Sequence, residues 1–111
     1  MKLWIDDMRP APEGYISFKG VNEALRFIVA NRADIEVISL DHDSGDYHKY
    51  GGDYIRILDE LERLSRKQTT EGLIWRMCLH NVIKFHLHSA NPVGVANMRR
   101  IIERNGWEEV K

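Results

Sequence analysis

Short apolar runs alternate with longer amphipathic stretches along the whole chain. The apolar runs are rich in β-branched and aromatic residues, which predicts strands at residues 2–5, 16–18, 35–40, 82–87 and, as a short last strand, 107–111. Apolar residues recur at helical spacing in three other stretches, which predicts helices at residues 22–31, 54–64 and 92–105. Residues 65–72 are polar and residues 73–79 are apolar without a clean period, so neither stretch is assigned to an element.

Strands that alternate with helices favour right-handed crossovers and a mainly parallel sheet. The pattern therefore predicts a three-layer α/β fold, with a mainly parallel sheet of four or five strands and helices on both faces. The chain has 111 residues and contains no internal repeat, low-complexity segment or linker. This length suits one hydrophobic core, so we expect residues 1–111 to form a single domain.

The composition narrows the range of partners and compartments. Sixteen basic and 17 acidic side chains give a formal net charge of -1, so no overall field attracts duplex nucleic acid or an anionic membrane. The apolar run at residues 3–5 is too short for a signal-peptide core, and no stretch is long enough to span a bilayer. Cys78 is the only cysteine, which excludes an internal disulfide and a cysteine zinc cage. We expect a cytoplasmic protein that captures any anionic ligand locally.

Polar residues follow three of the predicted strands directly. They are Asp6-Asp7 after the first strand, Asp41-His42-Asp43 after the third, and His88-Ser89-Ala90-Asn91 after the fourth. The carboxyl ends of parallel strands meet at one edge of a sheet, and ligands of such folds bind there. The three groups are therefore expected to form one site, although they are far apart in the sequence.

The acidic residues at these strand ends are candidate metal ligands. Adjacent carboxylates such as Asp6 and Asp7 repel each other unless a cation or a proton compensates them, and Mg²⁺ or Mn²⁺ is the natural partner of oxygen ligands. Asp41 and His42 would also suit Fe²⁺ or Zn²⁺, and the sequence does not choose among these metals. The alternative is a pair of solvated polar turns, with His42 bonded to a nearby carbonyl group.

The segment after the fourth strand is a candidate phosphate site. Asn91 before Pro92 is a typical N-cap, and the free N–H groups of a helix start attract phosphate. Ser89 and Asn91 can donate further hydrogen bonds, and the guanidinium of Arg9 matches paired phosphate oxygens. The alternatives are a structural His88 and an ion pair from Arg9 to Asp7 or Asp43.

Several other polar and aromatic residues are expected to have structural roles. His86 is predicted to be structural or surface-exposed, and His48 and His80 are given no role. Gly51-Gly52-Asp53 is interpreted as a flexible helix start with an acid that favours the helix dipole. Trp4, Trp75 and Trp107 are interpreted as core or rim aromatics.

The acidic strand ends resemble those of receiver domains in two-component signalling. Asp6-Asp7 is similar to their acidic pair, Asp41 to the aspartate after their central strand, and Ser89 to their hydroxyl residue. The chain differs in having a short loop after the first strand, and only Lys111 follows the last predicted strand.

A closer resemblance is to the receiver-like family predicted to process cyclic phosphates. The motifs that carry it span nearly the whole chain and are Leu3-Trp4-Ile5-Asp6-Asp7-Met8-Arg9, Ser39-Leu40-Asp41-His42-Asp43, Gly52-Asp53-Tyr54 and His88-Ser89-Ala90-Asn91-Pro92-Val93-Gly94. The resemblance implies a receiver-like, flavodoxin-like fold. It also implies an enzymatic derivative of that fold, acting on a cyclic phosphate of a nucleotide, an RNA end or an ADP-ribose derivative.

These observations lead to the hypothesis of a phosphoesterase that opens a cyclic phosphate. Such a reaction needs activation of water, protonation of the leaving alkoxide and neutralisation of the phosphoryl oxygens. The hypothesis assigns Mg²⁺ or Mn²⁺ to Asp6, Asp7 and Asp41, acid–base work to His42 and His88, and phosphate binding to Arg9, Ser89 and Asn91. Asp43 either ligates the metal or fixes the tautomer of His42.

Two other functions stay open from the sequence. One is a signalling receiver that is phosphorylated on Asp41, and the other is a non-catalytic module that binds a cyclic nucleotide. The sequence does not indicate an oligomeric state.

Overall fold

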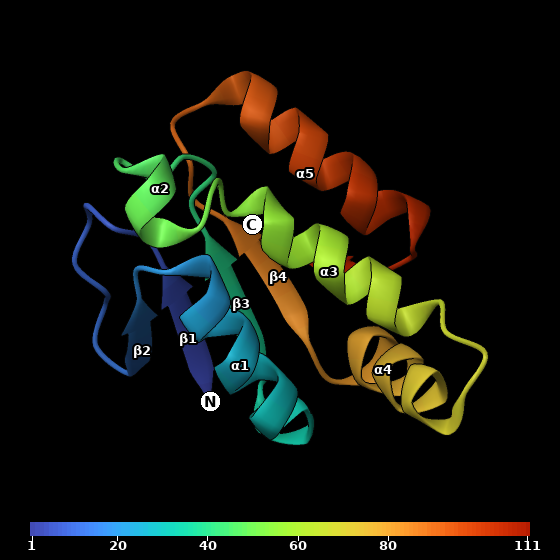
Figure 1. The fold of residues 1–111 in the computed structure, drawn as a ribbon. Helices are drawn as coiled ribbons and strands as arrows, with labels where there is room; N and C mark the ends of the chain where they lie inside the picture. The colour runs from blue at the N-terminus through green and yellow to red at the C-terminus, as the bar shows by residue number, and fades with distance from the viewer.

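The sheet is built from five short parallel strands (Figure 1). A computed structural model describes all residues from 1 to 111. The strands are β1 Lys2–Ile5, β2 Tyr15–Phe18, β3 Val37–Leu40, β4 Lys84–Leu87 and β5 Glu108–Glu109, and their order in the sheet is β2-β1-β3-β4-β5. The predicted α/β class, the parallel sheet and the five strands are confirmed.

The three predicted helices are present, together with two that the pattern did not reveal. The helices are α1 Val21–Asn31, α2 Tyr47–Tyr50, α3 Ile55–Ser65, α4 Thr70–Asn81 and α5 Pro92–Arg104, and a short 3₁₀ turn follows α1 at Arg32–Asp34. In α4, Trp75 is fully buried whereas Ile74 and Met77 on either side of it are exposed. Apolar residues thus occupy more than one side of this helix, which explains why residues 73–79 showed no clean period.

All the long helices pack on one face of the sheet, as Figure 1 shows. The connections from β2 to β3, from β3 to β4 and from β4 to β5 all step across the sheet in the same direction. Right-handed crossovers therefore place α1, α3, α4 and α5 on the same side. Only the step from β1 to β2 runs the other way, and residues 6–14 between them contain no helix. The structure thus differs from the expected three layers, because no helix covers the second face.

The strands alternate between these two faces. Leu3, Ile38 and Phe85 lie side by side in register and point into the core beneath the helices, where they are fully buried. Their neighbours Trp4, Ser39 and His86 are also in register and point to the uncovered side, which we call the open face. The structure has a single core of 22 buried apolar residues, to which Leu3, Ile38 and Phe85 on the helical side belong and Trp4, Ser39 and His86 on the open face do not.

The carboxyl ends of β1, β3 and β4 form a continuous rim. The backbone N–H of Asp41 donates to the carbonyl of Ile5 at 3.0 Å, and that of His88 donates to the carbonyl of Leu40 at 2.9 Å. The strand ladder therefore continues one residue beyond β3 and β4, and it places Asp6, Asp41 and His88 side by side. None of the helices combines the length and the apolar composition that a bilayer span requires.

Candidate functional site

Three carboxylates meet at this rim and form what we call the acidic cluster. Asp6, Asp7 and Asp41 each offer an oxygen that lies within 4.8 Å of the others. Asp6 is 1% exposed and Asp41 is 9% exposed, so these charges have little contact with water. Carboxylates at such distances repel one another, and each needs a hydrogen-bond donor or a cation.

Most oxygens of the acidic cluster have a donor in the protein. The Oδ1 of Asp6 accepts from the backbone N–H groups of Met8 at 2.8 Å and Arg9 at 3.2 Å. The Oδ1 of Asp41 accepts from the backbone N–H of His42 at 2.8 Å. The Oδ2 of Asp7 accepts from the backbone N–H of Gly45 at 2.6 Å.

The Oδ1 of Asp7 differs from them, because it is buried and has no hydrogen-bond partner. A buried carboxylate oxygen without a donor is destabilising, and such groups are rare in folded proteins. Asp7 lies with Asp6 and Asp41 in a set of oxygen donors, the kind that Mg²⁺ and Mn²⁺ accept. The acidic cluster therefore fits a divalent cation.

A second group lies beside the acidic cluster and is centred on His42. The Nδ1 of His42 is 2.7 Å from Oδ1 of Asp43, and this hydrogen bond is the main reason why the pKa of Asp43 lies below its usual value. An ionised Asp43 accepts only, so Nδ1 of a neutral His42 carries the proton and Nε2 is left bare. That Nε2 has no protein partner and is not buried, so the ring presents a free acceptor at the rim.

The start of α5 holds this arrangement in place. Asn91 caps the helix by accepting from the N–H of Gly94 at 3.0 Å, and its amide donates to Oδ2 of Asp43 at 3.1 Å. A Cβ on Gly94 would lie 2.4 Å from Cγ of His42, so only glycine lets the helix pack against the imidazole ring. In this first turn Pro92 has no backbone N–H and that of Gly94 is bonded to Asn91. The backbone N–H of Val93 is therefore left without a partner.

His88 is fixed more tightly than His42. Its ring stacks on Trp4 with the centroids 3.7 Å apart, and its Nε2 is 3.0 Å from Oδ2 of Asp6. Its Nδ1 is 2.8 Å from Oγ of Ser39, so both ring nitrogens have a partner. Burial lowers the pKa of His88, and the hydrogen bond to Asp6 opposes this effect only in part.

The other two predicted phosphate ligands differ in their freedom. Arg9 donates from Nη1 to the carbonyl of His88 at 2.6 Å and lies 3.7 Å from Asp6, and 44% of its side chain is exposed. Its other donors can therefore reach a ligand. Ser89 accepts at Oγ from the N–H of Asn91 at 3.1 Å, a local turn that leaves it without a contact to either cluster.

The structure brings the three sequence groups together. Asp6 contacts His88, Asn91 contacts Asp43, and Gly45 links the loop after β3 to Asp7. The structure brings the predicted site residues into this network, and Ser89 joins it only through the backbone N–H of Asn91.

Sequence reasoning undervalued three residues at this rim. Asp53, interpreted as part of a helix start, offers an oxygen within 4.8 Å of ligand atoms on His42 and Asp43. Tyr54 is fully buried, and burial first and the charges of the acidic cluster second raise the pKa of its hydroxyl, which therefore stays neutral. Ser39 bridges His88 and His86, at 2.8 and 2.7 Å. The Gly-Asp-Tyr motif and the lone polar residue in the third apolar run were the available signals.

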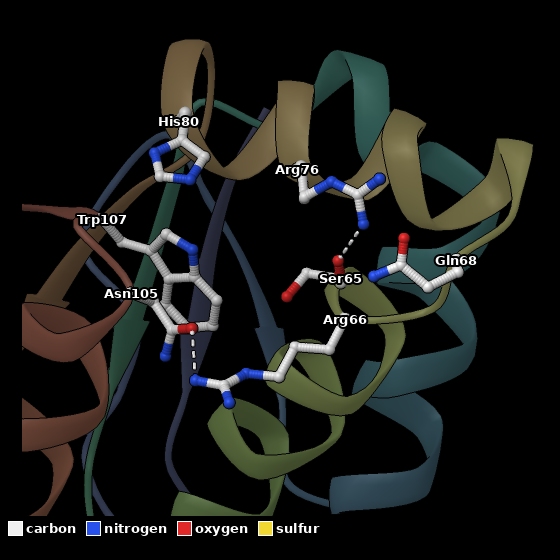
Figure 2. Close-up of a pocket in the computed structure, with 7 residues that line it drawn as sticks. All are labelled: Ser65, Arg66, Gln68, Arg76, His80, Asn105 and Trp107. Carbon is white, nitrogen blue, oxygen red and sulfur yellow. Dashed lines mark hydrogen bonds between the residues drawn. The ribbon is translucent and has the colours of Figure 1, made fainter.

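A polar cavity of about 400 Å³ lies at the opposite rim, among the carboxyl-terminal ends of α3, α4 and α5 (Figure 2). Its charged groups already have partners. Arg76 donates from Nη1 to the carbonyls of Ser65 at 2.7 Å and Lys67 at 3.0 Å, as a cap of α3. Arg66 contacts Asn105 and Glu62. The cavity therefore offers less unpaired charge than the acidic cluster does.

A parallel sheet in the order β2-β1-β3-β4-β5, with acidic residues after β1 and β3, defines the class of receiver-like α/β domains. A comparison with sequence models of protein families makes the assignment more specific. The chain belongs to the family of cyclic-phosphate processing receiver domains, whose model matches residues 1–104. No curated protein and no solved structure gave a significant match.

Proposed function

We propose that this protein is a metal-assisted phosphoesterase that opens a cyclic phosphodiester at the rim of the sheet. The observation that carries the proposal is the orphaned Oδ1 of Asp7, buried among the other carboxylates of the acidic cluster and close to the His42–Asp43 pair. The description of the family supports the substrate class. The ligand is a small cyclic phosphate of a nucleotide, an RNA end or an ADP-ribose derivative.

The residues that would hold a divalent cation are Asp6, Asp7 and Asp41. Such a cation supplies neutralisation of the phosphoryl oxygens, whose charge grows in the transition state. Mg²⁺ or Mn²⁺ suits a donor set made only of carboxylate oxygens. Arg9 adds a positive charge on the same side, because part of its guanidinium is free to bind phosphate.

His42 is proposed as the general base. Its bare Nε2 accepts a proton from the attacking water while oxygen bonds to phosphorus. Asp43 holds the tautomer and stabilises the imidazolium that forms. Asn91 fixes Asp43 in turn, and it thereby acts on the phosphate site through the position of the base rather than as a free ligand.

His88 is proposed as the general acid. The Nε2 of His88, which faces Asp6, gives its proton to the leaving oxygen of the cyclic phosphate as the bond between phosphorus and that oxygen breaks. The balance is one water added and one phosphoester bond broken, with one proton taken up at His42 and one released from His88. The phosphate is oriented by Arg9 and the free N–H of Val93, with Ser89 at the edge of this surface.

Phosphorus NMR of a panel of cyclic phosphates tests the proposal. Cyclic mononucleotides, a cyclic-phosphate RNA end and an ADP-ribose derivative that carries a cyclic phosphate are each incubated with the protein, once with Mg²⁺ or Mn²⁺ and once with a chelator. We expect at least one of them to convert to a monoester with metal and not with chelator. Folded, metal-loaded protein that turns over no member of the panel would contradict the proposal.

The same samples distinguish the two competing functions. Tight binding by calorimetry without product would indicate a binding module. A gain of one phosphoryl mass from a small acyl phosphate, lost in Asp41→Asn, would indicate a signalling receiver.

A further inference from the structure

Three large apolar side chains at the rim of the strand carboxyl termini are mostly exposed to water. Met8 is 78% exposed, Val93 is 70% exposed and Tyr47 is 60% exposed, and these are the highest exposed fractions among the large apolar residues of the chain. Met8 follows β1, Tyr47 opens α2 after β3, and Val93 lies in the first turn of α5 after β4. All three therefore belong to the segments that carry the acidic cluster and the His42–Asp43 pair.

The loop after β3 brings Met8 and Tyr47 close to the acidic cluster. A Cβ on Gly45 would lie 3.9 Å from the sulfur of Met8 and 2.6 Å from Oδ2 of Asp7, so the loop passes beside both side chains. Tyr47 is two residues further along, and since consecutive Cα atoms are about 3.8 Å apart, its Cα lies within about 8 Å of that of Gly45. The tyrosine is thus a near neighbour of the carboxylates, and α2 lies beyond the tips of β1 and β3 (Figure 1).

The ring of Tyr47 is supported by the backbone of Gly52. A Cβ on Gly52 would lie 3.5 Å from Cζ and 3.6 Å from Cε2 of the ring. The N–H of Gly52 donates to the carbonyl of Tyr47 at 2.8 Å, and the hydroxyl of Ser44 donates to the carbonyl of Gly52 at 3.0 Å. The ring is therefore fixed from below while more than half of its surface stays free, and a ligand that binds it has little side-chain freedom to remove.

Val93 borders the site from the other side. Its neighbour Gly94 packs against the His42 ring, and the backbone N–H of Val93 itself has no partner. The polar groups of the site are thus bordered by apolar side chains from three segments. Neither a cation nor a phosphate group makes use of such side chains, whereas ligand sites commonly combine apolar walls with a few polar groups. The apolar residues point to a part of the ligand beyond the phosphate.

We propose that Tyr47, Met8 and Val93 form a nucleobase site, so that the cyclic phosphate processed here lies on a ribose that carries a base. The inference rests on the proposed function, because it takes the phosphate to bind at the acidic cluster. The free face of Tyr47 stacks on the base, since every base has a π-face. The thioether of Met8 makes a favourable contact with an aromatic ring, and Val93 adds apolar surface.

This proposal narrows the substrate class. A cyclic mononucleotide and a cyclic-phosphate RNA end both carry a base on the ribose that bears the cyclic phosphate. An ADP-ribose derivative with its cyclic phosphate on the ribose that lacks a base places the adenine much further away. The nucleobase site therefore favours the first two ligands over the third.

Binding of ring-opened products tests the nucleobase site without turnover. Adenosine monophosphate and ribose monophosphate each carry a phosphate monoester and differ at the base. Calorimetry with Mg²⁺ is expected to give a Kd about 10-fold lower for adenosine monophosphate. Equal Kd values, or no binding of either compound, would overturn the inference. Hydrolysis of cyclic phosphates can fail while adenosine monophosphate still binds, and a base-free cyclic phosphate can be hydrolysed without a nucleobase site, so the two proposals fail separately.

The role of Tyr47 is tested with two variants of this exposed residue. Tyr47→Leu keeps an apolar side chain but removes the ring, and it should raise the Kd of adenosine monophosphate about 10-fold and leave that of ribose monophosphate unchanged. Tyr47→Phe should bind both as the wild type does. Proton NMR gives a second readout, because the ring current of residue 47 should shift the base protons upfield in the wild type and in Tyr47→Phe only. Wild-type affinity and shifts in Tyr47→Leu would overturn the proposal.

Met8 has a matched control in Met77, which is 56% exposed on α4, at the opposite end of the sheet from α2 (Figure 1). Met8→Ala is expected to raise the Kd of adenosine monophosphate about 3-fold, and Met77→Ala should leave it unchanged. Equal Kd values in the two variants would contradict the assignment of Met8 to the site.

Competition against adenosine monophosphate distinguishes the sources of the base. The competitors are a cyclic mononucleotide, a short RNA with a cyclic-phosphate end, and the ADP-ribose derivative with its cyclic phosphate on the base-free ribose. Displacement by the mononucleotide or the RNA supports the inference, and the tighter of the two identifies the source. Displacement by the ADP-ribose derivative alone, or by none of the three, would overturn it.

Discussion

The two rims of the sheet treat their charges differently. At the rim of the helix carboxyl termini, Glu62 accepts from Nε and Nη2 of Arg104 at 2.7 Å each and from the amide of Asn105. These bonds, led by that of Arg104, lower the pKa of Glu62 to about 2. At the rim of the strand carboxyl termini, three carboxylates lie together, the guanidinium of Arg9 is 3.7 Å from Asp6, and Asp7 keeps a buried oxygen with no donor.

The difference indicates which rim is built for a ligand. Where donors and acceptors match, as around Glu62, the charges hold the ends of α3 and α5 together and have nothing left to bind. At the strand rim, Asp7 keeps a buried oxygen without a donor beside two other carboxylates, and under the proposed function a cation would relieve their repulsion. The cavity of Figure 2 is therefore structural in this comparison.

The largest effect is expected when one histidine is substituted at each rim and the two variants are compared. His42→Gln is expected to lower kcat for a cyclic phosphate by about 10²–10⁴-fold, because the general base is lost. His80→Gln, at the cavity of the opposite rim, should leave kcat unchanged. Steady-state kinetics of both variants, with circular dichroism to verify folding, measures the contrast. Equal losses in both variants would remove the distinction between the rims.

A pair of glycines sharpens the same comparison. Gly94→Ala places a Cβ 2.4 Å from the His42 ring and should displace the ring. This displacement is expected to lower kcat about 100-fold. Gly72→Ala places a Cβ 1.9 Å from the carbonyl oxygen of Lys67 at the other rim, which should lower stability and leave the kcat of the folded fraction intact. Kinetics and urea denaturation of each variant test this division. A Gly94→Ala enzyme with normal kcat would show that the contact does not position His42.

The repulsion among the three carboxylates predicts that the wild type and an Asp7→Asn variant respond differently to metal. Asp7→Asn removes one charge from the acidic cluster, so the metal-free variant should be more stable than the wild type. Mg²⁺ at ten times its dissociation constant should stabilise the wild type by about 1.4 kcal/mol and leave the variant unaffected. Thermal unfolding with and without Mg²⁺ measures both effects, and Glu62→Gln is the control that should keep the metal response. A wild type that shows no response to Mg²⁺ or Mn²⁺ would argue against the cation site.

The smallest expected effect belongs to the paired rim. Glu62→Gln should cost about 1 kcal/mol at neutral pH, because the network with Arg104 is lost. A lowered native pKa means that this stabilisation is present above the ordinary value of 4.5 and is lost as the pH falls towards about 2. Urea denaturation across that window should show the wild type and the variant converging at the acid end. A constant difference between them would mean that the ionised Glu62 is not its cause.

Some elements could be predicted because their signals are local. The apolar run Leu3-Trp4-Ile5, ended by two aspartates, predicted β1, and the Asn91-Pro92 pair caps α5 where it was expected. The start of α4 has a local signal too, since Thr69 accepts from the N–H of Gly72. Its body does not, because Trp75 is buried and Met77 is exposed only as a result of how α4 lies against α3.

The sequence by itself determined which acidic and imidazole groups end the strands, because period and caps act over a few residues. Only the tertiary structure decided that Asp6 bonds to His88, 82 residues away, and that Ser39 lies between two imidazoles. It also decided that one face of the sheet stays uncovered. These outcomes depend on strand order and crossover handedness, which arise from packing the whole chain and leave no mark on any short stretch of it.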